Sequence, residues 1–277
     1  MEHKTLGRSN LKIPVLGLGT WGIGGFSAKS TEGDDLSVAA LRLGLDLGMR
    51  FIDTAEIYAG GHSEEVVAKA IRNQRDSVFL ATKVSAENLT YDGVLKSCNA
   101  SLKRLDTAYI DLYQVHWPSS RIPISDTMKA MERLAKDGKI RHVGVSNFSM
   151  KQTKEAQEAL SSLDLASNQV EYSLNERSIE NDLLPYAEQE GITIVAYSPL
   201  ARGLISRSSG DRWRLIDEIA SKYHKTRSQV ALNWLIEKGP VVAIPKARDP
   251  QHLHENAGAQ GWRMLKEDSE ALSRAFT

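Results

Sequence analysis

The chain has 277 residues, of which 41% are hydrophobic, enough to build the core of a sizeable globular protein. Lys and Arg number 35, as do Asp and Glu, so no net charge favours binding to nucleic acid or to an anionic membrane. The single Cys98 excludes an intrachain disulfide and a thiolate-rich metal site. The polar start lacks the apolar core of a secretion signal, and no apolar run is long enough to cross a bilayer, so we expect a cytoplasmic protein.

The expected elements begin with a short β-hairpin, in which residues 4–6 and 11–13 flank the turn Gly7-Arg8-Ser9-Asn10. After it, short apolar runs typical of buried strands alternate with amphipathic stretches typical of helices. The expected strands are 15–18, 50–52, 78–81, 110–115, 141–145, 167–170, 193–196 and 241–244. The expected helices are 35–48, 63–73, 92–105, 125–137, 150–160, 179–190, 226–238 and 250–258, with two extra helices at 211–223 and 266–275. Ser63 and Ser149 are candidate N-caps for their helices.

Eight strand–helix repeats without a long linker predict one α/β domain over residues 1–277, a (β/α)8 TIM barrel with an N-terminal β-hairpin and two extra helices. A doubly wound open sheet is the alternative. The run Gly17-Leu18-Gly19-Thr20-Trp21-Gly22 has the spacing of a dinucleotide-binding fingerprint. That fingerprint requires a helix at once, whereas no helical pattern appears here until about Asp34. We therefore expect these glycines to let the backbone pass close to a ligand in the barrel mouth.

Polar side chains occur where the expected strands end. Barrel enzymes place their chemistry at the carboxyl ends of the strands. The residues at or just after such ends are Asp53, Lys83, His116, Ser146, Asn147, Gln169, Tyr197 and Lys246. One polar residue at a strand end is ordinary turn chemistry, but a whole series converging on one rim predicts an active site.

Four residues near this rim could deliver a proton to a carbonyl oxygen. Tyr58 is a poor acid, because a phenol has a pKa of about 10, and a neighbouring Lys83 ammonium would lower that pKa. Asp53 would keep Lys83 charged, because a buried lysine alone tends to lose its proton. His116 could donate a hydrogen bond to the same carbonyl oxygen, so the chemistry needs no metal. Each residue alone also fits a structural role, such as an ion pair beneath the rim.

The chain resembles the aldo-keto reductases over nearly its whole length. The most specific segments, which occur in family order, are Phe51-Ile52-Asp53-Thr54-Ala55 with Tyr58, Gly144-Val145-Ser146-Asn147-Phe148, and Tyr197-Ser198-Pro199-Leu200. The resemblance implies an (α/β)8 barrel that reduces aldehydes and ketones to alcohols with NADPH, which is bound extended and without a Rossmann motif. It also implies that Tyr58 is the general acid, that Lys83 and Asp53 tune it, and that His116 orients the carbonyl.

The same resemblance implies a cofactor site. Ser146, Asn147 and Gln169 would hydrogen-bond the nicotinamide carboxamide, and Tyr197 would stack under the ring. The other expected cofactor contacts are Gly19, Thr20, Trp21, Asp53, Ser198, Pro199, Leu200, Arg202, Gly203, Ile244, Lys246, Ala247, Arg248, His252, Glu255 and Asn256. Lys246 and Arg248 supply the positive charge that a 2′-phosphate attracts. His252 stands where many members carry Arg or Gln, so NADH remains an alternative cofactor.

The substrate pocket is expected to be open, because the segment from Gly203 to Asp211 is short and little chain follows the last helix. Besides Tyr58 and His116, its expected lining is Trp21 and Trp117, with Ile57 as a further candidate wall, which predicts loose specificity for aldehydes and activated ketones. We expect a monomer or a weak oligomer. Two alternative functions stay open: a sugar or alcohol dehydrogenase working mainly in the oxidative direction, and a cofactor-sensing regulatory subunit.

Overall fold

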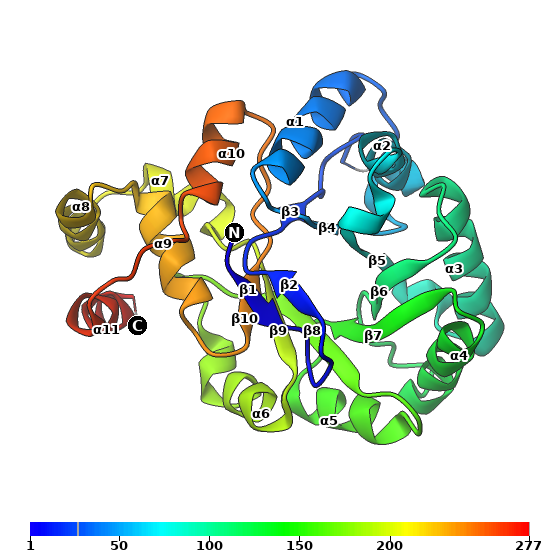
Figure 1. The fold of residues 1–277 in the computed structure, drawn as a ribbon. Coiled ribbons are helices and arrows are strands. Elements are labelled where there is room, and N and C mark those ends of the chain that lie inside the picture. The colour runs from blue at the N-terminus through cyan, green and yellow to red at the C-terminus, as the bar shows by residue number, and fades with distance from the viewer. Residues whose placement is uncertain (27, 277) are drawn as a thin grey trace.

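Eight parallel strands lie side by side in chain order in the computed structural model, which describes residues 1–26 and 28–276 (Figure 1). They are β3 (Leu18–Gly19), β4 (Phe51–Asp53), β5 (Phe79–Val84), β6 (Ile110–Val115), β7 (Ile140–Ser146), β8 (Leu165–Glu171), β9 (Thr193–Tyr197) and β10 (Val241–Ala243). A parallel bridge between Leu16 and Ala243 joins the first edge to the last, and the Gly17 amide donates to the Ala243 carbonyl at 2.8 Å. The sheet is therefore closed, so the predicted barrel is confirmed and the open-sheet alternative is wrong.

Helices surround the ring of strands, and the predicted hairpin, β1 (His3–Thr5) with β2 (Lys12–Pro14), lies across one end (Figure 1). The helices are α1 (Asp34–Asp46), α2 (His62–Ile71), α3 (Tyr91–Arg104), α4 (Ile124–Lys136), α5 (Met150–Ala159), α6 (Leu183–Glu190), α7 (Leu204–Arg207), α8 (Asp211–Tyr223), α9 (Arg227–Ile236), α10 (Pro250–Ala257) and α11 (Lys266–Ala275). The extra helices α8 and α11 pack together beside the barrel. Over the described residues, no helix has both the length and the apolar character that crossing a membrane requires.

Of the two predicted N-caps, Ser149 is confirmed and Ser63 is wrong. Ser149 caps α5 in a capping box with Gln152, as expected. Ser63 is not a cap, because α2 begins one residue earlier, after Gly61 with φ 94°. A glycine adopts this left-handed conformation without strain, so the turn sets the helix start, and the Ser63 hydroxyl donates instead to Thr20 Oγ1 at 3.0 Å.

The segment 203–211, which the sequence predicts to be a short loop, contains a one-turn helix. The helix α7 lies between Gly203 and Asp211, within the stretch that was expected to be a short connection. Its start follows a left-handed turn at Arg202 and Gly203, with φ of 54° and 87°, and Arg207 Nε donates back to the Gly203 carbonyl at 3.1 Å. A single helical turn is too short to show a clear periodicity in the sequence.

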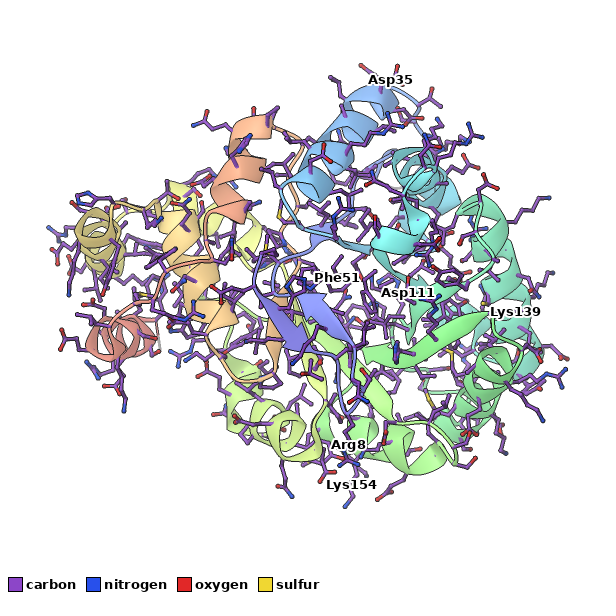
Figure 2. All side chains as sticks on the ribbon, viewed as in Figure 1. Arg8, Asp35, Phe51, Asp111, Lys139 and Lys154 are labelled. Atoms are coloured by element: carbon purple, nitrogen blue, oxygen red, sulfur yellow. The ribbon has the colours of Figure 1, made fainter. Side chains whose placement is uncertain are left out.

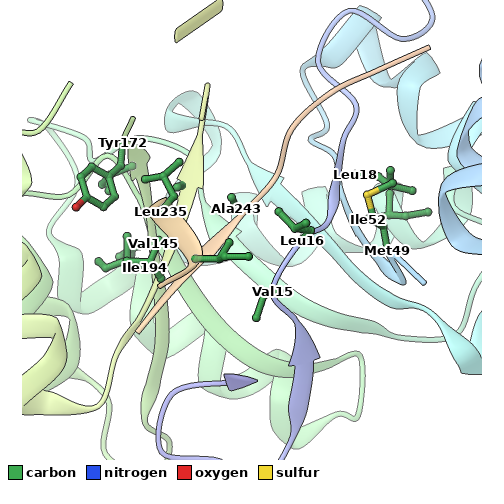
Figure 3. Packing of buried hydrophobic residues seen from close by; sticks show 14 of the residues in the cluster. Val15, Leu16, Leu18, Met49, Ile52, Val145, Tyr172, Ile194, Leu235 and Ala243 are labelled. Atoms are coloured by element: carbon green, nitrogen blue, oxygen red, sulfur yellow. The ribbon is translucent and has the colours of Figure 1, made fainter. Parts of the chain in front are cut away.

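The buried apolar side chains form two clusters, one on each face of the strands. Neighbouring residues of a strand point to opposite faces, so Ile52 packs outward with the helices while Phe51 packs inside the barrel. Figure 3 shows part of the outer cluster, where Val145 and Ile194 of the strands lie near Leu235 of α9. In Figure 2, Phe51 lies near the middle of the ring, behind the hairpin. The inner cluster consists of Leu6, Ile13, Phe51, Phe79, Ala81, Leu112, Ala166, Val195, Val242 and Ile244.

The hairpin closes the amino end of the barrel. Its apolar residues Leu6 and Ile13 belong to the inner cluster. The ammonium of Lys4 in β1 donates to the carbonyls of Ile236 and Lys238 at 2.6 Å and of Val241 at 2.8 Å, which fastens the hairpin to the end of α9 and the start of β10. Because apolar side chains fill this end of the barrel, polar residues that could carry out chemistry are expected at the carboxyl end.

We expect Lys4→Met to lower the free energy of unfolding by about 2 kcal/mol, because charge-assisted hydrogen bonds to three carbonyls are lost. Lys12→Met in the same hairpin is the matched control, since the Lys12 ammonium bonds to just the exposed Thr5 hydroxyl among the residues that the structure describes, and should change stability by less than about 0.5 kcal/mol. Urea titration measures both. Equal effects of the two variants would contradict this role of Lys4.

Candidate active site

Four polar side chains meet near the carboxyl ends of three adjacent strands. Asp53 is the last residue of β4, and Lys83 lies near the end of β5. His116 directly follows β6, and Tyr58 begins the 3-10 turn Tyr58–Gly61. The structure therefore brings together the four residues that the sequence singled out, each through the end of an element rather than through a flexible loop.

The Lys83 ammonium lies at the centre of this group and is fully buried. It donates to Asp53 Oδ2 at 2.7 Å, to the Thr54 carbonyl at 2.9 Å and to the phenolic oxygen of Tyr58 at 3.4 Å. Burial alone would lower the pKa of Lys83, but attraction by Asp53 and the contact with Tyr58 hold that pKa above its usual value. Lys83 is therefore a permanent cation at neutral pH.

The contact with Lys83 fixes what the Tyr58 hydroxyl can do. An ammonium is a donor only, so the phenolic oxygen must accept this hydrogen bond, and its own proton points elsewhere. The sequence predicts that Lys83 lowers the pKa of Tyr58, and the Lys83 charge does act in that direction. Burial is the larger effect and, with Asp53, raises the pKa of Tyr58 overall. Tyr58 is thus protonated at neutral pH, as a proton donor must be.

The His116 ring lies against Tyr58, edge to face, with ring centroids 5.6 Å apart. Burial, helped by the nearby Lys83 charge, lowers the pKa of His116 to about 3. The imidazole is therefore neutral and has one N–H to donate. Its main chain is held on both sides, because the His116 amide donates to the Val84 carbonyl at 2.9 Å and its carbonyl accepts from Asn147 Nδ2 at 3.0 Å.

The four residues expected at the nicotinamide form one hydrogen-bonded group at the ends of β7, β8 and β9. Ser146 Oγ donates to the Gln169 carbonyl at 2.8 Å, and the Tyr197 hydroxyl donates to Asn147 Oδ1 at 2.9 Å. Gln169 Nε2 donates to Asp53 Oδ1 at 2.7 Å. The sequence did not indicate this last bond, which connects the expected nicotinamide site to the proton-delivering residues.

The other expected cofactor residues lie on three segments at the same end of the barrel. The Gly19 amide donates to the Pro245 carbonyl at 3.2 Å, so the segment from Gly19 to Trp21 runs beside the segment from Ile244 to Arg248. Arg248 donates to the Gly22 carbonyl. The segment from Ser198 to Gly203 follows β9 and forms a 3-10 turn at Ala201–Gly203. In α10, His252 is exposed and Asn256 is buried.

Lys246 and Arg248 form a cationic pair. Burial lowers the pKa of Lys246, and the nearby Arg248 charge lowers it further. Over residues 1–26 and 28–276, neither side chain has a carboxylate partner within salt-bridge distance. Two neighbouring cations without a carboxylate suit an anionic group. A phosphate-bearing cofactor fits this donor set.

Large apolar side chains near this end remain accessible. Trp21 is 56% exposed, Trp117 49% and Ile57 47%. The Trp21 ring also meets the exposed Phe26 ring edge to face, with centroids 5.3 Å apart. Trp21 and Trp117 each follow a strand end, next to the residues that the sequence assigned to the site. Both are therefore accessible, and their role as apolar walls of a substrate pocket stays a prediction.

Sequence reasoning missed Gln114, whose side-chain amide donates to Asp53 Oδ1 at 3.3 Å. Gln114 is fully buried inside the barrel, although glutamine is mostly a surface residue. The signal was its position two residues before His116, because the alternation of side chains along β6 puts position 114 on the same side as the position that directly follows the strand.

Comparison with known proteins identifies the family. The model of the aldo/keto reductase family matches residues 15–275. This chain belongs to the aldo/keto reductases. It is similar to methylglyoxal reductase YeaE of Escherichia coli (strain K12), with 39% identity over 278 residues that cover 100% of this chain and 96% of the relative.

Solved aldo-keto reductase structures superpose closely on this fold. The thermostable aldo-keto reductase Tm1743, solved in a complex with the inhibitor epalrestat, shares 42% identity, with a TM-score of 0.95 and coverage of 99% of this chain and 100% of that one. An aldo-keto reductase of Klebsiella pneumoniae, solved with NADPH, shares 37% identity, with a TM-score of 0.90 and coverage of 100% and 96%. These identities show more than a shared fold, because they extend over whole chains.

The low pKa of His116 predicts a pH dependence of stability. Between about pH 6.5 and pH 3 the unfolded chain binds a proton at this histidine and the folded aldo-keto reductase does not. The stability that neutral His116 contributes is therefore complete above pH 6.5 and is lost as pH falls, by up to about 1.4 kcal/mol per pH unit. We expect His116→Gln to lose less stability than the wild type between pH 7 and pH 4.5. Chemical denaturation at each pH measures this, and parallel curves for the two proteins would refute it.

Proposed function

We propose that this protein reduces aldehydes and ketones to alcohols with NADPH, and that Tyr58 delivers the proton. The observation that carries the proposal is the fully buried Lys83 ammonium, which joins the Asp53 carboxylate to the Tyr58 phenol. Proton donors and oxyanion donors of this kind stabilise the negative charge that grows on a carbonyl oxygen during reduction.

Proton delivery follows from the charges around Tyr58. As negative charge develops on the substrate oxygen, the Tyr58 proton moves to it and a phenolate remains. The phenolate is stabilised by the Lys83 ammonium, which already donates to the same oxygen at 3.4 Å. Because Lys83 is fully buried and Tyr58 is partly buried, this attraction is stronger than it would be in water. In the oxidative direction the same phenolate would act as the base.

His116 has the role of orienting the carbonyl. Its neutral ring donates one hydrogen bond without placing a second cation beside Lys83. Its edge-to-face contact with Tyr58 and its main-chain bonds to Val84 and Asn147 restrict where that donor points. A carbonyl oxygen bound by both Tyr58 and His116 would be held for attack on its carbon.

The cofactor supplies the hydride. We assign its nicotinamide to Ser146, Asn147, Gln169 and Tyr197 and its 2′-phosphate to Lys246 and Arg248. The supporting observations are the hydrogen-bonded group at the ends of β7, β8 and β9 and the cationic pair, which has no carboxylate partner in the part of the chain that the structure describes. The similar Klebsiella pneumoniae enzyme, solved with NADPH, supports the same choice. NADH remains the alternative, because His252 stands where many family members carry Arg or Gln.

For the substrate, we favour small activated carbonyls such as 2-oxoaldehydes. The similar Escherichia coli protein is a methylglyoxal reductase, and the exposed side chains of Trp21, Ile57 and Trp117 would contact a small apolar group without enclosing it. The comparisons do not favour an oxidative dehydrogenase or a regulatory subunit. The single domain, the cytoplasmic location, the lack of nucleic-acid partners and the monomeric or weakly oligomeric state stay predictions.

Tyr58→Phe tests the proposal. Removing the phenolic oxygen should lower kcat about a hundredfold or more, because the proton donor is lost while the ring remains. NADPH binding should be kept, since Tyr58 carries no cofactor contact in this assignment. The measurement is the loss of reduced-nicotinamide absorbance with methylglyoxal and with an aromatic aldehyde, using NADPH and NADH in turn. Tyr91→Phe, an exposed tyrosine at the start of α3, is the matched control.

Undiminished turnover in Tyr58→Phe would remove Tyr58 from the proton-donor role. A wild-type protein that binds NADPH but turns over none of these carbonyls would contradict the proposed reduction itself. A faster reaction with NADH than with NADPH would contradict the choice of NADPH and the assignment of Lys246 and Arg248 to a 2′-phosphate, but not the proposed reduction.

A further inference from the structure

Two glutamine side chains donate to the same oxygen of Asp53. Gln169 Nε2 lies 2.7 Å and Gln114 Nε2 3.3 Å from Asp53 Oδ1. The other oxygen, Oδ2, accepts from the Lys83 ammonium at 2.7 Å. All four side chains are buried. The orientation of the Asp53 carboxylate is therefore set by two amides on one oxygen and by one cation on the other.

The direction of the Gln114 amide is determined by its surroundings. Its Oε1 is buried and has no hydrogen-bond partner among the described residues. Turning the amide over would place that oxygen against Asp53 Oδ1, and two acceptors repel each other. Only the orientation with Nε2 toward Asp53 forms a bond. A buried amide is unfavourable unless it is hydrogen-bonded, so Asp53 is what makes glutamine acceptable at this position.

The barrel interior has room for Gln114 because of a glycine. In the sheet register, Gln114 of β6 pairs with Gly144 of β7, and Gly144 pairs with Ser167 of β8. A Cβ atom on Gly144 would lie 2.9 Å from Gln114 Cγ and 2.6 Å from Ser167 Oγ, closer than real Cβ contacts. Any side chain at 144 would displace Gln114 from its path toward Asp53.

We infer that Gln114 is a positioning residue for the proposed reduction: it holds Asp53 Oδ1 so that Oδ2 stays on Lys83. This inference rests on the proposed function. Gln169 is also assigned to the nicotinamide, so its side-chain amide would bond to both Asp53 and the cofactor. Gln114 is buried inside the barrel, and among the described residues its side chain bonds only to Asp53. It therefore keeps the Asp53–Lys83 pair in place when cofactor binding and release disturb Gln169.

The test compares Gln114→Met with wild type at saturating NADPH and methylglyoxal. Methionine fills a similar volume without a donor, so we expect kcat to fall about tenfold, while the Kd for NADPH changes by less than about twofold. With Asp53 held less firmly, its attraction for Lys83 weakens and the pKa of Lys83 falls. The loss of activity at alkaline pH should therefore begin at a lower pH than in wild type.

A control and a second variant separate positioning from packing. Ser167→Ala alters a buried polar side chain of the same interior layer that has no bond to Asp53, and should leave kcat and the pH profile unchanged. Gly144→Ala keeps both amides but crowds Gln114, and should reproduce the effects of Gln114→Met. The double variant Gln114→Met/Gln169→Met should lose more kcat than the product of the two single losses, because each amide supports the other.

The inference is overturned if Gln114→Met matches Ser167→Ala in kcat and in its pH profile. A second measurement does not depend on activity. The Lys83 side chain, labelled with 13C at Cε and assigned by its absence in Lys83→Met, should titrate at a lower pH in Gln114→Met than in wild type. An unchanged titration overturns the inference even in a protein without turnover, whereas an inactive wild type with a shifted titration would contradict only the proposed reduction.

Discussion

The site depends on one ammonium ion that is kept charged where no water can reach it. Lys83 is fully buried, and desolvation alone would neutralise it. The Asp53 carboxylate reverses this tendency, and two glutamine amides hold that carboxylate in place. The arrangement places a fixed positive charge, the Lys83 ammonium, beside the phenolic oxygen of Tyr58. Removing one partner of such a pair would leave an uncompensated buried charge, so the Lys83 ammonium and the Asp53 carboxylate each need the other to stay charged inside the barrel.

The barrel supplies the rigid support for this group. The hairpin and the inner apolar cluster fill the amino end, and the polar layer begins one step further along the strands, with Phe51 below Asp53 and Leu112 below Gln114. Because successive inward residues on one strand are two positions apart, the same strands provide both core and chemistry. Charged groups in this layer are positioned by strand ends, which move less than loops.

Much of this organisation could be predicted from the sequence, because the strands are short apolar runs and the site residues directly follow them. The sequence could not show which effect would dominate the pKa of Tyr58, since burial is a property of the folded structure. It also gave no sign that Gln169 and Gln114 converge on Asp53 from strands far apart in the chain. The false cap at Ser63 and the unforeseen helix α7 have a common reason: left-handed turns at Gly61 and at Arg202–Gly203 set where those helices begin.

The most direct measurement of the central claim is the turnover of Lys83→Met with NADPH over a range of pH. Methionine keeps the unbranched side chain up to the position of Cε and removes the charge that stabilises the Tyr58 phenolate. The account predicts that kcat falls about a hundredfold or more at every pH, while the protein, although less stable, stays folded and still binds NADPH. Turnover close to that of the wild type at neutral pH would show that the buried charge is not needed, and would contradict the account.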